Sequence, residues 1–128
     1  MVSVRAFMLT AGLSAVALAS GALATPTADV ARGKALFARC AGCHAVVPGA
    51  RSIGPNLAGV EGRKAASAGS YAYSPALARL KITWDRGNLD KFLAGPQKMA
   101  PGSKMAFAGL ADPGQRADVI AYLATLQD

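Results

Sequence analysis

The chain has 128 residues, with 14 Lys and Arg against 7 Asp and Glu, so that its formal net charge is +7. This length allows one small domain and excludes a multidomain enzyme. One His and two Cys exclude multi-His metal sites and paired zinc knuckles. Only 6% of the residues are aromatic, which suggests that something besides protein helps to fill the interior.

Residues 1–24 are predicted to be a cleaved signal peptide, followed by a single domain over residues 25–128. Arg5 supplies a basic start, an uncharged apolar run covers residues 6–20, and Ala22-Leu23-Ala24 is a small-residue cleavage site. An uncleaved membrane anchor is the alternative, but the run is shorter than the ~20 residues that a spanning helix needs. The predicted product is an exported, periplasmic protein without an integral membrane segment.

The excess of positive charge predicts an anionic partner. Nucleic acid, anionic lipid and an acidic protein all fit a basic chain. Export argues against nucleic acid, and the basic residues are dispersed along the chain. We therefore expect a monomer that meets partners with acidic surfaces.

Three helices are predicted in chain order. The first starts near Thr27, has Asp29 in its first turn and carries an apolar stripe at Val30, Gly33, Leu36 and Phe37. The second starts around residues 83–85, carries Leu89, Phe92 and Leu93, and stops at Gly95-Pro96. The third opens with the capping sequence Asp112-Pro113-Gly114-Gln115.

Two long loops are predicted between these helices, over residues 45–79 and 97–109, because Gly and Pro recur there. Loops of this length are unusual in a small domain unless they wrap around something. No alternating pattern predicts a strand. The expected class is all-α, with three main helices, short ones and long loops around a bound group.

The sequence Cys40-Ala41-Gly42-Cys43-His44 is the strongest motif in the chain. Cysteines at positions i and i+3 of a helical turn lie on one side. Each can add to one haem vinyl group, and His44, one turn after Cys40, can then bind the iron. C-x-x-C-H is typical of c-type haem attachment.

Other roles for these cysteines fit less well. A disulfide oxidoreductase needs a βαβ context, which the sequence does not show. A zinc site needs two further ligands that no other Cys or His supplies. A disulfide between Cys40 and Cys43 would close a short, strained loop.

The composition does not identify the sixth ligand of the iron. His44 is the only His, which excludes two histidine ligands from one chain. Met99 and Met105 both follow the second predicted helix, and spacing alone does not separate them. Either one could also be a gap-filling core residue.

The chain resembles the class I c-type cytochromes, specifically the bacterial cytochrome c2 group, which is similar to mitochondrial cytochrome c. The resemblance runs through most of residues 25–128. Its motifs are Gly33-Lys34-Ala35-Leu36-Phe37, Cys40 to His44, Gly54-Pro55-Asn56-Leu57, Gly62-Arg63-Lys64, Tyr71-Ala72-Tyr73-Ser74, Ile82-Thr83-Trp84, Pro101-Gly102-Ser103-Lys104-Met105, and Arg116 to Leu123.

The resemblance implies one covalent haem c with His44 and Met105 as its metal ligands, Met105 being favoured over Met99. It implies that the Pro55 carbonyl accepts the proton of the His44 ring, and that Gly33 and Phe37 pack on the last helix near Tyr122. The residues that match the family's donors to the buried haem propionate are Arg63, Tyr73 and Trp84. Ser103 keeps the hydroxyl of the family's usual Thr.

The chain also departs from the family pattern. Phe92 replaces a common Tyr near the ligand sulfur, and Leu77 replaces an Asn of the buried water network. Arg39, Lys98 and Lys104 match the ring of docking cations around the haem edge, but Gln97 does not. The family often has further lysines after the loop that contains Met105. In this chain those positions are Ala111, Asp112 and Pro113. We expect weaker electrostatic steering than usual.

The resemblance predicts a soluble periplasmic electron carrier rather than an enzyme. Compatible partners are a cytochrome bc1 complex, a terminal oxidase, a photosynthetic reaction centre and a periplasmic dehydrogenase. The alternative is a haem-based peroxidase or ligand sensor with a labile Met ligand. The residues show no second His and no obvious acid–base pair near the Met loop to support that chemistry.

Overall fold

The computed structural model of the protein describes residues 27–127 and confirms the predicted all-α class. The predicted signal peptide, residues 1–24, lies outside the described residues. The helices are α1 (Val30–Leu36), extended by the 3₁₀ turn Phe37–Arg39, α2 (Pro75–Ala78), α3 (Arg86–Ala94), α4 (Pro96–Met99) and α5 (Pro113–Leu123). Between residues 27 and 127 the only β pairing is an isolated bridge between Lys64 and Thr83.

Side-chain caps define where the main helices begin. Asp85 accepts a hydrogen bond from the Asn88 amide, and Asp112 accepts one from the Gln115 amide, as the capping sequence of the last helix predicts. Asp29 accepts one from the Arg32 amide and is itself the N-cap. The expectation that Asp29 lies inside the first turn was therefore wrong, since α1 begins one residue later.

Two short helices interrupt the segments that were predicted as loops. Pro75 and Pro96 each occupy the first turn of a four-residue helix, α2 and α4. The sequence predicts short helices without bounds, and it marks Gly95-Pro96 only as the end of the second helix. Proline is also favoured at the first helical position, where its missing N–H leaves no bond unmade, and Ser74 caps α2 through a bond from the Leu77 amide.

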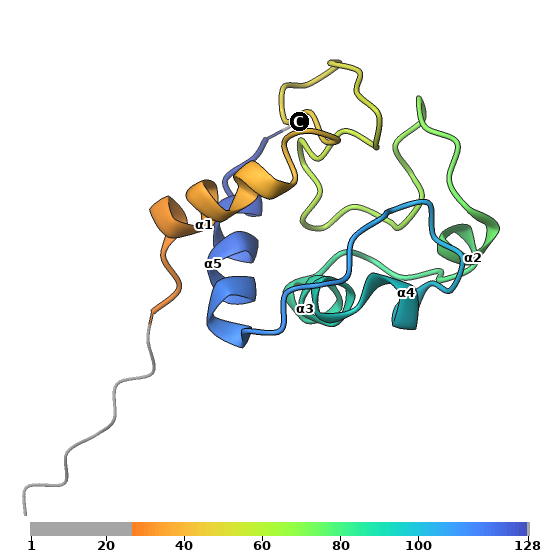
Figure 1. The fold of residues 1–128 in the computed structure, drawn as a ribbon. Helices are drawn as coiled ribbons and strands as arrows, with labels where there is room; N and C mark the ends of the chain where they lie inside the picture. The colour runs from red at the N-terminus through yellow and green to blue at the C-terminus, as the bar shows by residue number, and fades with distance from the viewer. Residues whose placement is uncertain (1–26, 128) are drawn as a thin grey trace, which may run out of the picture.

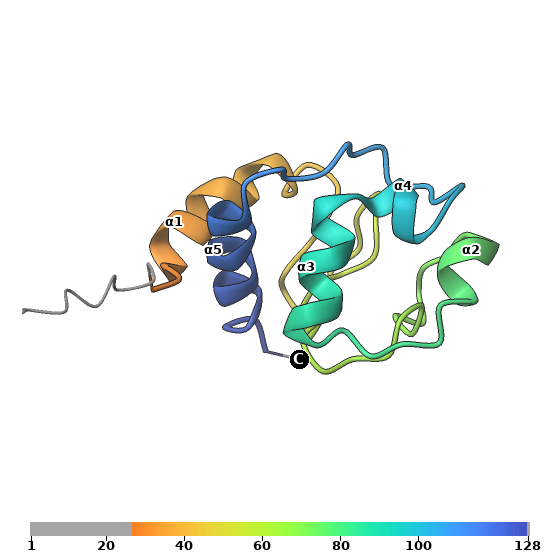
Figure 2. The same ribbon diagram turned by 90° about the horizontal axis from the view of Figure 1, so that it is seen from below.

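Helices α1 and α5 lie side by side at one side of the molecule, whereas α2 and α4 lie at the other (Figures 1 and 2). The predicted contact is confirmed. The Phe37 and Tyr122 ring centroids are 5.2 Å apart, and Gly33 faces the backbone of Asp118. Val30, predicted in the same apolar stripe, is instead 44% exposed, because it lies at the first turn of α1.

The carboxylate of Asp118 ties the start of α1 to α5. It is buried, and its two oxygens accept hydrogen bonds from the Asp29 amide at 2.6 Å and from Arg32 Nε at 2.9 Å. The bond from Arg32, followed by the backbone bond from Asp29, holds the pKa of Asp118 below its usual range. The folded protein therefore stabilises the ionised form of the Asp118 side chain.

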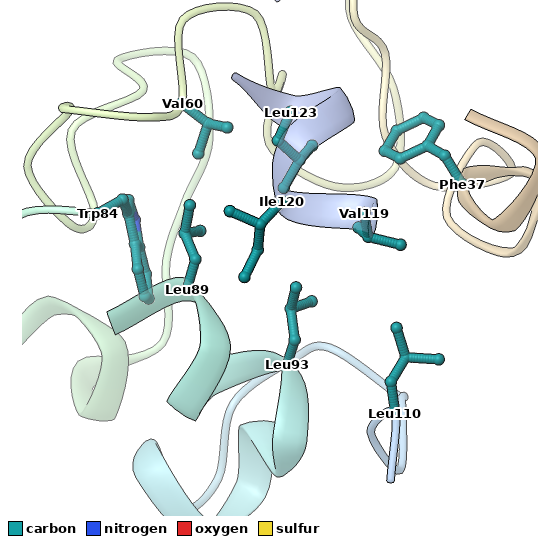
Figure 3. Packing of buried hydrophobic residues seen from close by; sticks show 9 residues of the cluster. All are labelled: Phe37, Val60, Trp84, Leu89, Leu93, Leu110, Val119, Ile120 and Leu123. Atoms are coloured by element: carbon teal, nitrogen blue, oxygen red, sulfur yellow. The ribbon is translucent and has the colours of Figure 1, made fainter. Parts of the chain in front are cut away.

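Nine buried apolar residues form the core, in which side chains of α3 and α5 point toward one another (Figure 3). They are Phe37, Val60, Trp84, Leu89, Leu93, Leu110, Val119, Ile120 and Leu123. Several of them also line a large cavity. None of the helices in the described part of the chain is long and apolar enough to cross a membrane.

Candidate haem-binding site

A cavity of about 860 Å³, measured out to its open mouth, lies among the core helices and the long loops. Eight of the nine predicted site residues line it: Cys40, His44, Pro55, Arg63, Tyr73, Trp84, Ser103 and Met105. The fold thus brings residues that are up to half of the chain length apart in sequence to the wall of one cavity.

The Cys40 to His44 segment forms a tight turn directly after α1 and its 3₁₀ extension. The amides of Cys43 and His44 both donate to the Cys40 carbonyl oxygen, at 3.0 and 2.9 Å. Both cysteines are free; Cys40 is half-buried in the cavity wall, whereas Cys43, the ninth predicted residue, is exposed. Burial raises the pKa of the Cys40 thiol.

The ring of His44 is held by the backbone of the following loop. Its Nδ1 atom lies 2.8 Å from the carbonyl oxygen of Pro55. A carbonyl oxygen can only accept, so Nδ1 carries the proton and Nε2 keeps a free lone pair. Such a bond fixes the tautomer and raises the basicity of a metal-binding imidazole.

The two methionines differ in position. Met105 lines the cavity, while Met99 is the last residue of α4. The loop before Met105 turns sharply, because the Ser103 amide donates to the Ala100 carbonyl at 2.9 Å and Gly102 has a φ of +84°. Proline followed by glycine with positive φ is typical of a type II turn.

Polar groups gather at another part of the cavity wall. The Nη atoms of Arg63 donate to the carbonyl oxygens of Ala58 and Asn56, both at 2.9 Å. The Nε atom of Arg63 is buried and has no hydrogen-bond partner among the described residues. Arg63 as a whole is half-buried, but a buried N–H of a cation without a partner calls for an acceptor, preferably an anion. A haem propionate fits this requirement.

Tyr73 also lines the cavity, and its hydroxyl oxygen accepts a hydrogen bond from the Ala68 amide at 3.2 Å. Its own proton remains available to donate. Trp84 is buried and packs against Phe92, with ring centroids 5.0 Å apart. Phe92 and Leu77, the two departures from the family pattern, both line the cavity as apolar groups.

Two features of this site were missed by sequence reasoning. The Lys104 ammonium, interpreted only as a docking cation, donates to the Ala72 carbonyl at 2.5 Å and lies 5.8 Å from the centre of the Tyr71 ring. Gln97, interpreted only as a missing cation, bonds to the Met105 loop. Neither contact has a local sequence signal, since each joins segments that the fold brings together.

Comparison with known proteins agrees with this arrangement. Residues 30–127 match the family model described as cytochrome c. The chain is 48% identical over 101 residues to cytochrome c of Euglena viridis, covering 78% of this chain and 99% of that protein. It is 44% identical over 110 residues to cytochrome c2 of Rhodomicrobium vannielii, covering 85% and 88%.

A solved structure has the same fold. Cytochrome cH from Methylobacterium extorquens matches with a TM-score of 0.72 and 45% identity, covering 76% of this chain and 98% of that one. These matches confirm the predicted fold and the predicted cofactor, haem c. They also confirm that the protein is an electron carrier rather than an enzyme. The chain belongs to the cytochrome c family.

Proposed function

We propose that this protein is a periplasmic single-electron carrier in which His44 and Met105 would hold the iron of one haem c. When bound, haem c supplies an iron that alternates between Fe(III) and Fe(II). The observation that supports this most is that His44, with its ring fixed by Pro55, and Met105 line one cavity together with Cys40. His/Met ligation raises the reduction potential and leaves no open coordination position.

The residues around the ligands favour little movement on electron transfer. The His44 ring is held by Pro55, and the Met105 amide donates to the Ser103 hydroxyl oxygen at 3.3 Å. The Lys104 ammonium also donates a hydrogen bond to the Ala72 carbonyl, which connects the loop that contains Met105 to the segment before α2. Because these contacts hold the backbone on both sides, we expect the same ligands in both oxidation states.

Arg63, Tyr73 and Trp84 are proposed to hold the haem propionate inside the protein. Two backbone carbonyls already fix the Arg63 side chain. Its Nε, which has no hydrogen-bond partner among the described residues, therefore offers a donor held in position. Donors held in place before binding compensate the cost of burying an anion. This arrangement also places a positive charge close to the cofactor.

Electrons are proposed to pass at the Cys43 side of the site, where the attachment turn is exposed. The surface cations Arg39, Lys98 and Lys104 provide attraction to an acidic partner surface, such as that of a cytochrome bc1 complex, a terminal oxidase, a reaction centre or a periplasmic dehydrogenase. A small interface with few fixed charges favours fast release. Transient docking suits a shuttle between respiratory or photosynthetic partners.

Export is proposed to follow from the signal peptide over residues 1–24. Expression of the full chain in a bacterium with a haem c maturation system, followed by fractionation, tests this. We expect the haem-containing form in the periplasmic fraction, starting at Thr25. Retention of residues 1–24 in a membrane fraction would instead support an anchor.

The decisive experiment is an absorption spectrum of the ferric holoprotein at neutral pH, in the near-red region of the iron–sulfur charge-transfer band. We expect the band in the unchanged protein and in Met99→Ala, and its loss in Met105→Ala. Loss in Met99→Ala alone would assign the ligand to Met99. A high-spin spectrum without the band, changing when a small ligand is added, would favour the haem-based peroxidase or sensor.

A further inference from the structure

The side-chain amide of Gln97 contacts the Met105 loop through both of its ends. Its Nε2 atom donates to the carbonyl oxygens of Ser103 at 2.9 Å and Met105 at 3.3 Å. Its Oε1 atom accepts a hydrogen bond from the Gly102 amide at 3.1 Å. One side chain of α4 thus bonds to three residues of the loop that carries Met105.

The backbone beneath Gln97 is well anchored. Pro96, directly before it, is among the most completely buried side chains, and Ala100 has no exposed surface. The Ala100 amide donates to the Pro96 carbonyl at 2.9 Å, which closes the single turn of α4. Because α4 is fixed at both ends, the Gln97 amide is a rigid support for the loop and does not simply follow its movements.

Only a carboxamide makes this set of bonds. A lysine has donors but no acceptor for the Gly102 N–H, and an ionised glutamate has acceptors but no donor for the two carbonyls. The family pattern has a docking lysine at this position, so this chain has an uncharged clamp in place of a surface cation. Residue 97 in this chain therefore supports the loop through hydrogen bonds, whereas a lysine there would attract a partner by its charge.

We infer that Gln97 is a positioning residue that holds Met105 in place and makes its thioether harder to displace. This inference rests on the proposed ligation by Met105. The Met105 carbonyl also accepts from the Phe107 amide at 3.0 Å, and the Met105 amide donates to Ser103 Oγ. Those two contacts are internal to the loop, whereas the bonds from Gln97 join the loop to the anchored turn of α4 that directly precedes it.

The test compares the holoprotein with its Gln97→Ala and Gln97→Glu variants, with Gln127→Ala as a matched control, since Gln127 is exposed and follows α5. Two quantities are measured at neutral pH. One is the hydrogen-exchange rate of the Gly102 amide. The other is the imidazole concentration that removes half of the near-red iron–sulfur band in the ferric protein, which measures how readily Met105 is displaced.

In Gln97→Ala we expect the Gly102 amide to exchange about fivefold faster, since a hydrogen bond of ~1 kcal/mol is lost. Imidazole should displace Met105 at a severalfold lower concentration. In Gln97→Glu the retained acceptor should keep Gly102 protected, yet displacement should become easier, because a carboxylate repels the two carbonyl oxygens. Gln127→Ala should match the unchanged protein in both measurements.

Unchanged Gly102 exchange in Gln97→Ala would overturn the clamp, and an unchanged imidazole midpoint would overturn its effect on Met105. The proposed ligation fails separately. If the unchanged protein lacked the near-red band, His44/Met105 ligation would be wrong, and the role of Gln97 toward the ligand would fall with it. A band that is present but insensitive to residue 97 would overturn this inference alone.

Discussion

Gly54 lies directly against the imidazole ring of His44. A β-carbon at residue 54 would come within 3.0 Å of His44 Cε1, 3.2 Å of Nδ1 and 3.0 Å of the Cys43 carbonyl oxygen. The Gly54 amide also donates to that carbonyl at 2.6 Å. The absence of a side chain at residue 54 therefore allows the Pro55 carbonyl to approach the ring.

Gly54→Ala should push the His44 ring or the loop out of place. We expect the holoprotein to lose about 1–3 kcal/mol of unfolding free energy, as is typical of overpacking at a rigid site. Guanidinium unfolding monitored by haem absorbance measures this. Gly69→Ala, where a β-carbon meets open space, is the control. Equal midpoints for the two variants would show that the loop accommodates the methyl group.

Arg63→Gln should lower the reduction potential. It removes a half-buried positive charge and leaves the proposed propionate without its cation, and both changes favour the ferric state. An electrostatic change of ~1 kcal/mol corresponds to about 40 mV for a one-electron couple. A redox titration measures the shift, with the exposed Arg51→Gln as the control. A potential that rises or stays constant contradicts the proposed role.

Gly33→Ala should separate α1 from α5. The new β-carbon would lie 1.9 Å from the Asp118 carbonyl oxygen and 2.5 Å from its carbon, and backbone atoms cannot rotate away. We expect a loss of about 3 kcal/mol or more in denaturant unfolding. Ala35→Gly on the exposed side of α1 should cost only about 1 kcal/mol. Equal losses of unfolding free energy in the two variants would show that the α1–α5 contact at Gly33 accommodates a methyl group.

Asp118→Asn should make the protein less sensitive to acid. Because the folded-state pKa of Asp118 is lowered, its carboxylate stabilises the fold above the unfolded-state pKa of about 3.9. That contribution disappears as the pH falls through the folded-state value. The variant should be less stable than the unchanged protein at pH 7, and the difference should shrink below pH 4. Unfolding midpoints across pH 2–7 measure it, and a constant difference contradicts the linkage.

Much of the fold follows from signals contained within a few residues. Asp85 and Asp112 predict the starts of α3 and α5 because a side-chain cap acts within one turn. The same local reasoning did not locate the expected short helices that begin at Pro75 and Pro96, since a proline after a loop or a helix can begin another helix. Whether it does so depends on the packing of the next turn, as the burial of Pro96 shows.

The sequence by itself determined the all-α class, the c-type attachment motif and the main helices, because each depends on spacing along one turn or one face. Only the tertiary structure placed Met105 in the cavity wall and Met99 in α4, left Arg63 Nε without a partner among residues 27–127, and brought Gln97 to the Met105 loop. These relationships depend on contacts between distant or separately folded segments, whose geometry is set by how the helices and loops pack together.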